Sequence, residues 1–241
     1  MKATRLAVFT LAFLTTACTG TLAEGRGDSV SSSLVEYLYP AGEKPPSPSR
    51  KIPRLPLPLR IGIAFVPSPH GPSQDLSEAE RFKLLYDLKA IFANQEFVEE
   101  VAVIPEPYLK AGTGFAPLAS TADTYGLNAM ALVSYDEVSI PAASSSLRYR
   151  TIVGVQTLTG ASNEVQNFVD TAVFDVATQR LLFRVPGISS MARQPATADT
   201  DADAQASRRR GFALAAADMT VNLDKELDAI EKRIRADSSL R

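Results

Sequence analysis

The sequence predicts an α/β (α+β) fold built on a single mixed β-sheet, with its elements in the order β-α-β-α-β-β-β-β-α. Two apolar strand patterns, at 59–67 and 97–105, are separated by an amphipathic helix pattern, which is typical of parallel strands. Four strand patterns then follow closely between residues 128 and 187, and closely spaced strands pair as antiparallel neighbours. A long helix pattern over 205–235 ends the predicted domain.

The first strand reads "LRIGIAFVP", where Ile61, Ile63 and Phe65 alternate with small residues. This pattern indicates a buried strand. The helix pattern that follows, over 76–95, opens on Ser77 and Glu80, the spacing of a capping box. A helical repeat of 3.6 residues places its apolar side chains on one face, which we expect to pack on the sheet; they are Phe82, Leu85, Leu88 and Phe92.

The middle of the chain predicts a glycine-containing loop and a short helix that ends at Gly126. A long strand at 128–141 follows, and 147–159 predicts a single further strand. The stretch 163–187 predicts a hairpin, with its polar turn at 177–179. The last helix repeats apolar residues at steps of three and four, namely Phe212, Ala216, Met219, Leu223, Leu227, Ile230 and Ile234.

The amino terminus has the three parts of a secretory signal. Lys2 and Arg5 precede an uncharged, mostly apolar run at 6–14, and three small residues follow it. As a helix this run is about 14 Å long, too short for a bilayer core of about 30 Å. Residues 1–17 are therefore predicted to be a removable signal peptide.

Cys18, the only cysteine, directly follows those small residues. One thiol excludes a disulfide within the chain and a cysteine metal cluster. The position resembles the lipobox of bacterial lipoproteins, although Thr15 stands where that family usually has Leu. The resemblance implies a palmitate-type lipid anchor on Cys18, and Thr19 in place of Asp implies the outer membrane, on its periplasmic side. The alternative is a soluble secreted chain with an incidental cysteine.

Residues 18–58 are predicted to be a flexible, proline-rich tether to a globular domain at 59–237. Within the tether, the apolar stretch 34–39 is expected to dock on the domain as a short helix or edge strand. Prolines recur from Pro45 to Pro58 and favour an extended polyproline spacer, with a proline-rich ligand for a partner groove as the alternative.

Composition sets the class of protein. The hydrophobic fraction is 45%, enough for a core without disulfides. The net charge is −2, so electrostatics give no reason to expect a nucleic-acid partner. No second apolar run approaches the roughly 18 residues of a membrane span.

Candidate catalytic residues are few. His70, the only histidine, lies in a predicted loop after the first strand, where sites tend to form, but an exposed loop residue is the better interpretation. Asp136-Glu137 and Glu99-Glu100 are adjacent carboxylates, and adjacent residues of a strand face opposite sides. Neither pair is therefore a natural acid/base couple.

Two further motifs carry no chemistry of their own. The loop 111–117, "AGTGFAP", lacks the Lys-Ser/Thr of a phosphate loop. Arg208, Arg209 and Arg210 precede or start the last helix, where they oppose its dipole; contact with the acidic residues 199–203, a partner or solvent is expected. The sequence thus predicts a non-enzymatic protein without a cofactor or metal.

Four segments together resemble the rhombotarget lipoprotein family of bacterial envelopes: "SSSLVEYLYP", "LPLRIGIAFVPS", "ALVSYDEV" and "NEVQNFVDTAVFDVATQRLLFRVPG". The family is associated with rhombosortase, a rhomboid-type intramembrane protease, and has no established activity. Only the lipobox residue Cys18 carries over. The element order is also similar to the small α/β domain of several envelope lipoproteins and of the Tol-system propeller protein.

These observations favour an outer-membrane lipoprotein that binds a protein partner in surface-protein sorting or envelope maintenance. Two alternatives stay open. One is an enzyme acting on envelope glycans, which needs a cleft with two carboxylates. The other is an oligomeric export pore like the curli-secretion lipoprotein, whose strands would come from 147–159 and 164–174. The oligomeric state is not predicted.

Overall fold

The structure is a computed structural model, and it describes residues 29–40, 43–46, 57–67, 76–110, 113–140, 146–160, 164–192 and 201–238. The mixed α+β class and the long carboxy-terminal helix are confirmed. The elements are β1 (Ser29–Ser31), α1 (Ser33–Leu38), β2 (Leu59–Phe65), α2 (Glu78–Ala93), β3 (Val98–Val103), α3 (Glu106–Lys110), α4 (Ala116–Tyr125), β4 (Ala129–Ser139), β5 (Ser146–Thr151), β6 (Gly154–Thr159), β7 (Glu164–Asp175), β8 (Arg180–Ala192) and α5 (Asp201–Ser238).

The main sheet has five strands in the order β3-β2-β4-β7-β8. Its first three strands are parallel, because β2 pairs in parallel with both β3 and β4. The long strands β4, β7 and β8 pair antiparallel. The predicted parallel start and antiparallel continuation are therefore both present.

The prediction of a single sheet is wrong, since a second, three-stranded sheet has the order β1-β5-β6. The segment 147–159, predicted as one strand, is the hairpin of β5 and β6. The turn between the two strands consists of Ile152 and Val153, β-branched residues of the type that favours strands. The one residue here that is unusual for a strand is Gly154, which has a φ of 140°. A positive φ of this kind favours glycine.

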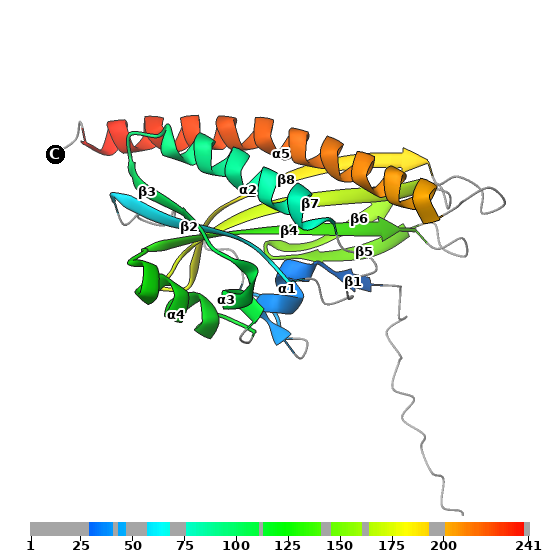
Figure 1. Cartoon of the computed structure of the whole chain (residues 1–241), viewed down its shortest axis with the longest axis horizontal. Helices are drawn as coiled ribbons and strands as arrows, with labels where there is room; N and C mark the ends of the chain where they lie inside the picture. Colours follow the sequence, from blue (N-terminus) through cyan, green and yellow to red (C-terminus); the bar gives the residue numbers. More distant parts are fainter. Residues whose placement is uncertain are drawn as a thin grey trace, which may run out of the picture.

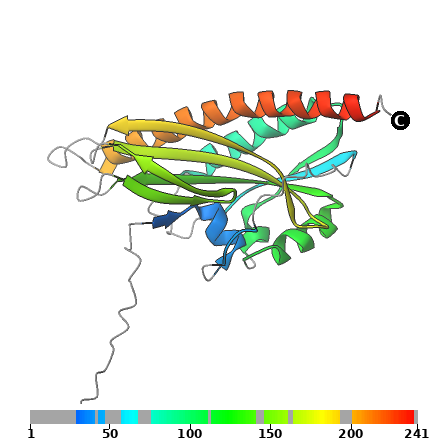
Figure 2. The same ribbon diagram turned by 180° about the vertical axis from the view of Figure 1, so that it is seen from behind.

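The two faces of the main sheet are covered differently, as Figures 1 and 2 show from opposite sides. Helices α2 and α5 lie along one face and share its core with β2, β4, β7 and β8. On the other face, α1, α3 and α4 cover one end, and the three-stranded sheet packs over the distal part of β4 and β7.

Both long helices use the predicted periodicity, with one exception. The capping box of Ser77 and Glu80 is present at the start of α2, and the predicted apolar face of α5 is buried up to Ile230. Phe82 was expected on the buried face of α2 but is 36% exposed, whereas Leu84 is buried in its place. Helix α5 begins at Asp201, four residues before the predicted start.

Helix α1 confirms the expected docking of the apolar stretch at 34–39. Leu34, Val35, Tyr37 and Leu38 are buried together with residues of α3, α4 and β4. Residues 29–38, which belong to the segment predicted as tether, are therefore packed on the domain. Residues 1–28 and most of the proline-rich stretch lie outside the described residues.

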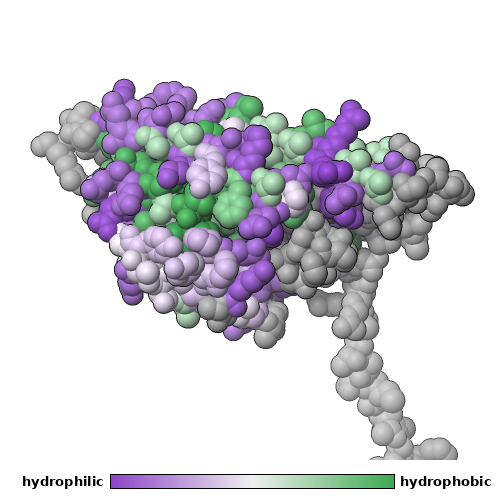
Figure 3. Space-filling view, in the orientation of Figure 1, coloured by the Kyte–Doolittle hydropathy of each residue, from purple (hydrophilic) through white to green (hydrophobic). Residues whose placement is uncertain are grey.

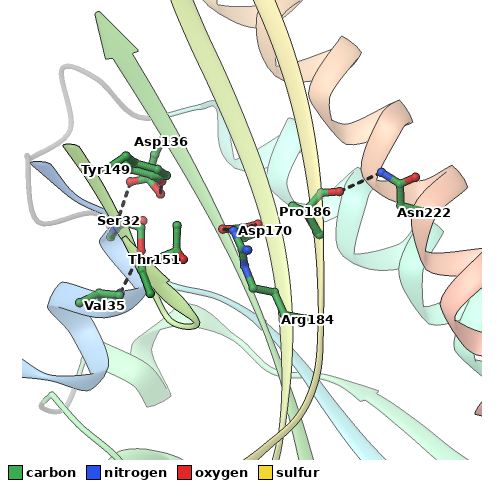
Figure 4. Close-up of polar contacts among 11 residues, drawn as sticks. Ser32, Val35, Asp136, Tyr149, Thr151, Asp170, Arg184, Pro186 and Asn222 are labelled. Atoms are coloured by element: carbon green, nitrogen blue, oxygen red, sulfur yellow. Dashed lines mark hydrogen bonds and ion pairs between the residues drawn. The ribbon is translucent and has the colours of Figure 1, made fainter. Parts of the chain in front are cut away.

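Helix α5 packs closely against the edge strand β8. A Cβ at Gly187 would overlap the backbone of Ala215 and Met219, so only glycine allows this approach. Two polar side chains of α5 then bond to the strand's backbone: Asp218 accepts from the Ile188 N–H at 3.0 Å, and the Asn222 amide donates to the Pro186 carbonyl at 3.0 Å (Figure 4).

Candidate functional site

A groove of about 880 Å³ opens where the end of α1, the start of α4 and the β7–β8 turn meet. We call it the aromatic groove. Its lining comes from six separate segments of the chain: Leu38, Tyr39, Pro40, Glu43, Pro46, Gly114, Phe115, Ala116, Ile152, Phe174, Thr178, Gln179, Arg180, Leu181 and Leu182. Most of these side chains are apolar, as in the majority of ligand sites.

Three rings form a continuous wall in the aromatic groove. Tyr39 and Phe115 meet edge to face with ring centroids 5.9 Å apart, and Phe115 meets Phe174 in the same way at 5.5 Å. Phe174 is fully buried, whereas Tyr39 and Phe115 are partly exposed. A partly exposed aromatic wall offers a large contact area with little loss of side-chain entropy, which suits the binding of a peptide or another apolar group.

Turn geometry fixes the rim of the aromatic groove. Asp175 accepts hydrogen bonds from both the backbone N–H and the hydroxyl of Thr178, and Gln179 follows with φ of 56°. On the opposite side, Gly114 has φ of 78° and donates its N–H to the Tyr37 carbonyl at 2.7 Å. A side-chain carboxylate thus holds one rim and a backbone hydrogen bond between distant segments holds the other, so the groove is pre-formed.

The α1 wall of the groove is anchored by a buried carboxylate, shown in Figure 4. Asp136 of β4 accepts the Ser33 N–H at 2.8 Å and the Tyr149 hydroxyl at 2.9 Å. Ser33 is the first residue of α1, and the Ser32 hydroxyl accepts from the Val35 N–H in the same turn. The carboxylate thus occupies the positive end of the helix, which favours negative charge.

Burial raises the pKa of Asp136 from 3.8 to about 6, although its hydrogen bonds from Ser33 and Tyr149 favour the ionised form. Asp170 of β7 lies on the same face and contributes a smaller rise through its charge. Asp170 itself is ion-paired with Arg184 of β8, whose Nη2 lies 2.6 Å from one carboxylate oxygen and 2.8 Å from the other. Burial raises the pKa of Asp170 as well.

This polar cluster lies inside the protein and does not open into the groove. Asp136 is 9% exposed and Asp170 is 1% exposed. Among the described residues, the Ser134 hydroxyl and Arg184 Nε are buried without a hydrogen-bond partner. The cluster therefore holds β4, β5, β7, β8 and α1 together, and it offers no acid/base pair to a ligand.

The structure separates the predicted carboxylate pairs. Asp136 faces α1 and β5, whereas Glu137 faces α5 and lies 3.2 Å from Arg208 Nε. This confirms that the two neighbours point to opposite sides of their strand. Glu99 and Glu100 are exposed on β3. Arg208, for which contact with the acidic residues 199–203 was among the expectations, pairs with Glu137 and lies within α5.

The remaining candidates from the sequence are Cys18, His70 and the loop 111–117. Cys18 and His70 lie outside the described residues. The loop 111–117, which lacks the residues of a phosphate loop, supplies Gly114 and Phe115 to the aromatic groove. The aromatic residue between Gly114 and a helix start was the available signal, but its neighbours in the groove come from distant segments and share no motif.

A second, smaller cavity of about 480 Å³ lies at the start of α5, between that helix and the ends of β7 and β8. It is lined by charged residues that include Glu137, Arg208 and Arg210. Within the described ranges, no cluster of histidine, cysteine, aspartate or glutamate is arranged to hold a metal ion. No described helix combines the length and the apolar character that a membrane span requires.

Comparisons with known proteins find similarity to solved structures only. No family model matches the sequence, and no curated protein matches it. The PelC dodecamer of Paraburkholderia phytofirmans is 10% identical, with a TM-score of 0.32, over 75% of this chain and 92% of that chain. A Xanthomonas campestris protein of family DUF330 is 10% identical, with a TM-score of 0.28, over 88% and 99%.

A third structure, a neuraminyllactose-binding hemagglutinin homolog from Helicobacter pylori, is also 10% identical, with a TM-score of 0.35. It is matched over 82% of this chain and 98% of that chain. Similarity at this level says nothing about what this chain binds or where it resides.

Proposed function

We propose that this chain is a lipid-anchored envelope protein that binds a partner protein through the aromatic groove and catalyses no reaction. The observation that carries the proposal is the pre-formed groove with its wall of three rings, Tyr39, Phe115 and Phe174. Rigid aromatic side chains at a partly exposed surface are characteristic of protein-binding hot spots. Glu43 and Arg180 place one negative and one positive charge on the rim, which orients a bound segment.

The proposed cellular location and the proposed role in sorting are both inferred from the sequence. A lipid anchor on Cys18 would hold the domain at the outer membrane, on the periplasmic side. The family resemblance adds an accessory role in rhombosortase-linked sorting of surface proteins.

The groove lining supports binding over catalysis. Glu43 is the only carboxylate among the described lining residues, and histidine and cysteine are absent from them. Glycoside hydrolysis uses two carboxyl groups about 5–10 Å apart across the substrate. The buried pair Asp136 and Asp170 is already bonded to other protein groups.

The strands considered for an export pore have other partners in this fold. β7 is paired with β4 on one side and β8 on the other. The segment 147–159 forms its own hairpin in the three-stranded sheet. These pairings favour a compact binding domain over the pore alternative.

The test combines crosslinking with matched variants. Full-length protein carrying a photo-crosslinking residue at Gln179 is expected to capture a discrete envelope protein, and the exposed change Arg180→Glu should reduce that capture. Tyr86→Ala removes an aromatic ring that is 59% exposed on α2, outside the groove, and should leave capture unchanged.

The lipid anchor is tested separately, because Cys18→Ala should release the protein from membranes. Equal capture by the Arg180 and Tyr86 variants, or turnover of a peptidoglycan fragment by the purified protein, would refute the proposal.

A further inference from the structure

The two sheets have four edge strands, and three of them are protected against pairing with another chain. Exposed edges carry unpaired backbone groups, which proteins normally block with charges, covering elements or short strands. β3 carries Glu99 and Glu100, one on each face. β8 is covered by α5, whose Asp218 and Asn222 bond to its backbone. β1 has only three residues.

A hydrophobic surface lies near β3, but the edge of this strand is still protected by charge. Figure 3 shows hydrophobic residues gathered over α2 and β3 among hydrophilic ones. Ile91, Val98 and Val103 are partly buried there against the core. The two carboxylates of β3 remain exposed at the edge itself, so this edge is still charged.

Within the part of the chain that the structure describes, the fourth edge, β6, has none of these protections. Its six residues, "GVQTLT", include no charge and no proline. Between Val155 and Leu158, the backbone groups that point away from β5 make no hydrogen bond to any described residue. Leu158 points into the core, so Val155, Thr157 and Thr159 stand on the outer face. All three are β-branched, the residue type that favours strands.

Positive charge lies beside this edge. On β5, Arg148 and Arg150 pair with Thr157 and Val155, and they therefore share the outer face of the sheet with them. Neither arginine forms an ion pair with a described residue. A strand added to β6 would lie about 10 Å from β5, a distance that an arginine and a glutamate side chain can bridge together.

From this placement we infer that β6 docks an extended segment of a partner protein, which adds a fourth strand to the β1-β5-β6 sheet. Acidic side chains of that segment lie on the same face as Arg148 and Arg150. The partner's backbone pairs with the β6 groups that make no hydrogen bond to a described residue, and its carboxylates pair with the two arginines. The inference rests on the proposed function for the existence of a protein partner, but it concerns a surface distinct from the aromatic groove.

The test uses a fluorescent peptide in which glutamate alternates with threonine, long enough to span β6. Binding to the purified protein is measured by fluorescence anisotropy, and amide hydrogen exchange should show new protection at 154–159. Val155→Glu should weaken binding by about tenfold or more, because it sets like charges side by side. Val221→Glu is the matched control, since both valines are 52% exposed and Val221 lies on α5. This control should bind as the wild type does.

A charge exchange tests the role of the arginines. The double change Arg148→Glu and Arg150→Glu should abolish binding of the glutamate peptide and create binding of the same peptide with lysine in place of glutamate. Binding of both peptides alike by the wild type, protection outside 154–159, or no binding at all would overturn the inference. A concentration-dependent dimer that Val155→Glu dissolves would also overturn it, in favour of a second copy of this chain.

The two proposals fail independently. If Arg180→Glu reduces partner capture but Val155→Glu changes neither capture nor peptide binding, the β6 inference fails and the groove proposal stands. If the peptide binds β6 as described but Arg180→Glu has no effect on capture, the groove proposal fails.

Discussion

Asp136 links the amino-terminal helix α1 to the two sheets through hydrogen bonds. Its carboxylate lies between the first N–H of α1 and the Tyr149 hydroxyl, and the residue is 9% exposed. The titratable groups that interact with it are Tyr135 on its own strand, Tyr149 on β5 and Asp170 on β7, and Asp170 is itself paired with Arg184 on β8. The cost of burying the charge exceeds the gain from the hydrogen bonds, which is why its pKa rises.

This rise in pKa makes stability depend on pH. Because the pKa of Asp136 is about 6 in the folded protein, above its ordinary 3.8, the folded state binds more protons between these values. The contribution to the free energy of unfolding is therefore fully present below about pH 3.8 and is lost as the pH rises through about 6. Its size is about 3 kcal/mol, from about 1.4 kcal/mol per pKa unit.

Asp136→Asn should remove this contribution, since the amide does not ionise. Urea unfolding of both proteins at several pH values between 4 and 7.5 measures it. The stability of the variant relative to the wild type is expected to increase by about 2–3 kcal/mol across that range. Asp170 titrates in both proteins, so its effect largely cancels in the difference. Parallel stability curves for the two proteins would show that Asp136 does not titrate as described.

At the scale of elements, α1 acts as a structural helix of the domain even though it has only six residues. Leu34 is 1% exposed within the core on that face of the sheet. Leu34→Ala should therefore lower the free energy of unfolding by about 3 kcal/mol. Glu36→Ala in the same helix leaves the core intact and should change stability by less than about 0.5 kcal/mol. Equal effects of the two changes in urea unfolding would mean that α1 is not packed as described.

Helix α5 packs closely on β8 at Gly187, where no side chain can be accommodated. Gly187→Ala forces a Cβ into the backbone of Ala215 and Met219, which cannot move without shifting the helix. A loss of about 3 kcal/mol in thermal or urea unfolding is expected. At Gly160 the nearest atom to a new Cβ is the end of the Glu164 side chain, so Gly160→Ala should cost much less. A wild-type melting temperature for Gly187→Ala would refute the close approach.

The elements that could be predicted from sequence are those with a long repeat. α2, α5 and the β7–β8 hairpin have enough turns or alternations to define a face. The β5–β6 hairpin was missed because its turn residues, Ile152 and Val153, have the same preferences as strand residues. The aromatic groove was missed for a different reason: Tyr39, Phe115 and Phe174 lie far apart in sequence, and only the topology brings them together.

At the scale of the whole molecule, the single cysteine links the domain to its proposed place in the cell. Ten residues separate Cys18 from Ser29, the first residue of β1, and an extended chain of this length spans at most about 40 Å. Lipid chains on Cys18 would therefore keep the three-stranded sheet and the aromatic groove near the membrane surface.

The state of this thiol can be measured directly. If Cys18 is acylated, the protein purified from membranes should contain no maleimide-reactive thiol even when denatured, because it has no other cysteine. Adding one cysteine at the exposed position Val221 should give one reactive thiol per chain, which controls for the labelling reaction. Two reactive thiols in that variant, together with a mass lacking acyl chains, would mean that the domain is not held at the membrane by Cys18. The partner would then have to bind a freely diffusing protein, and the affinities of the groove and of β6 would have to act without the high local concentration that a tether provides.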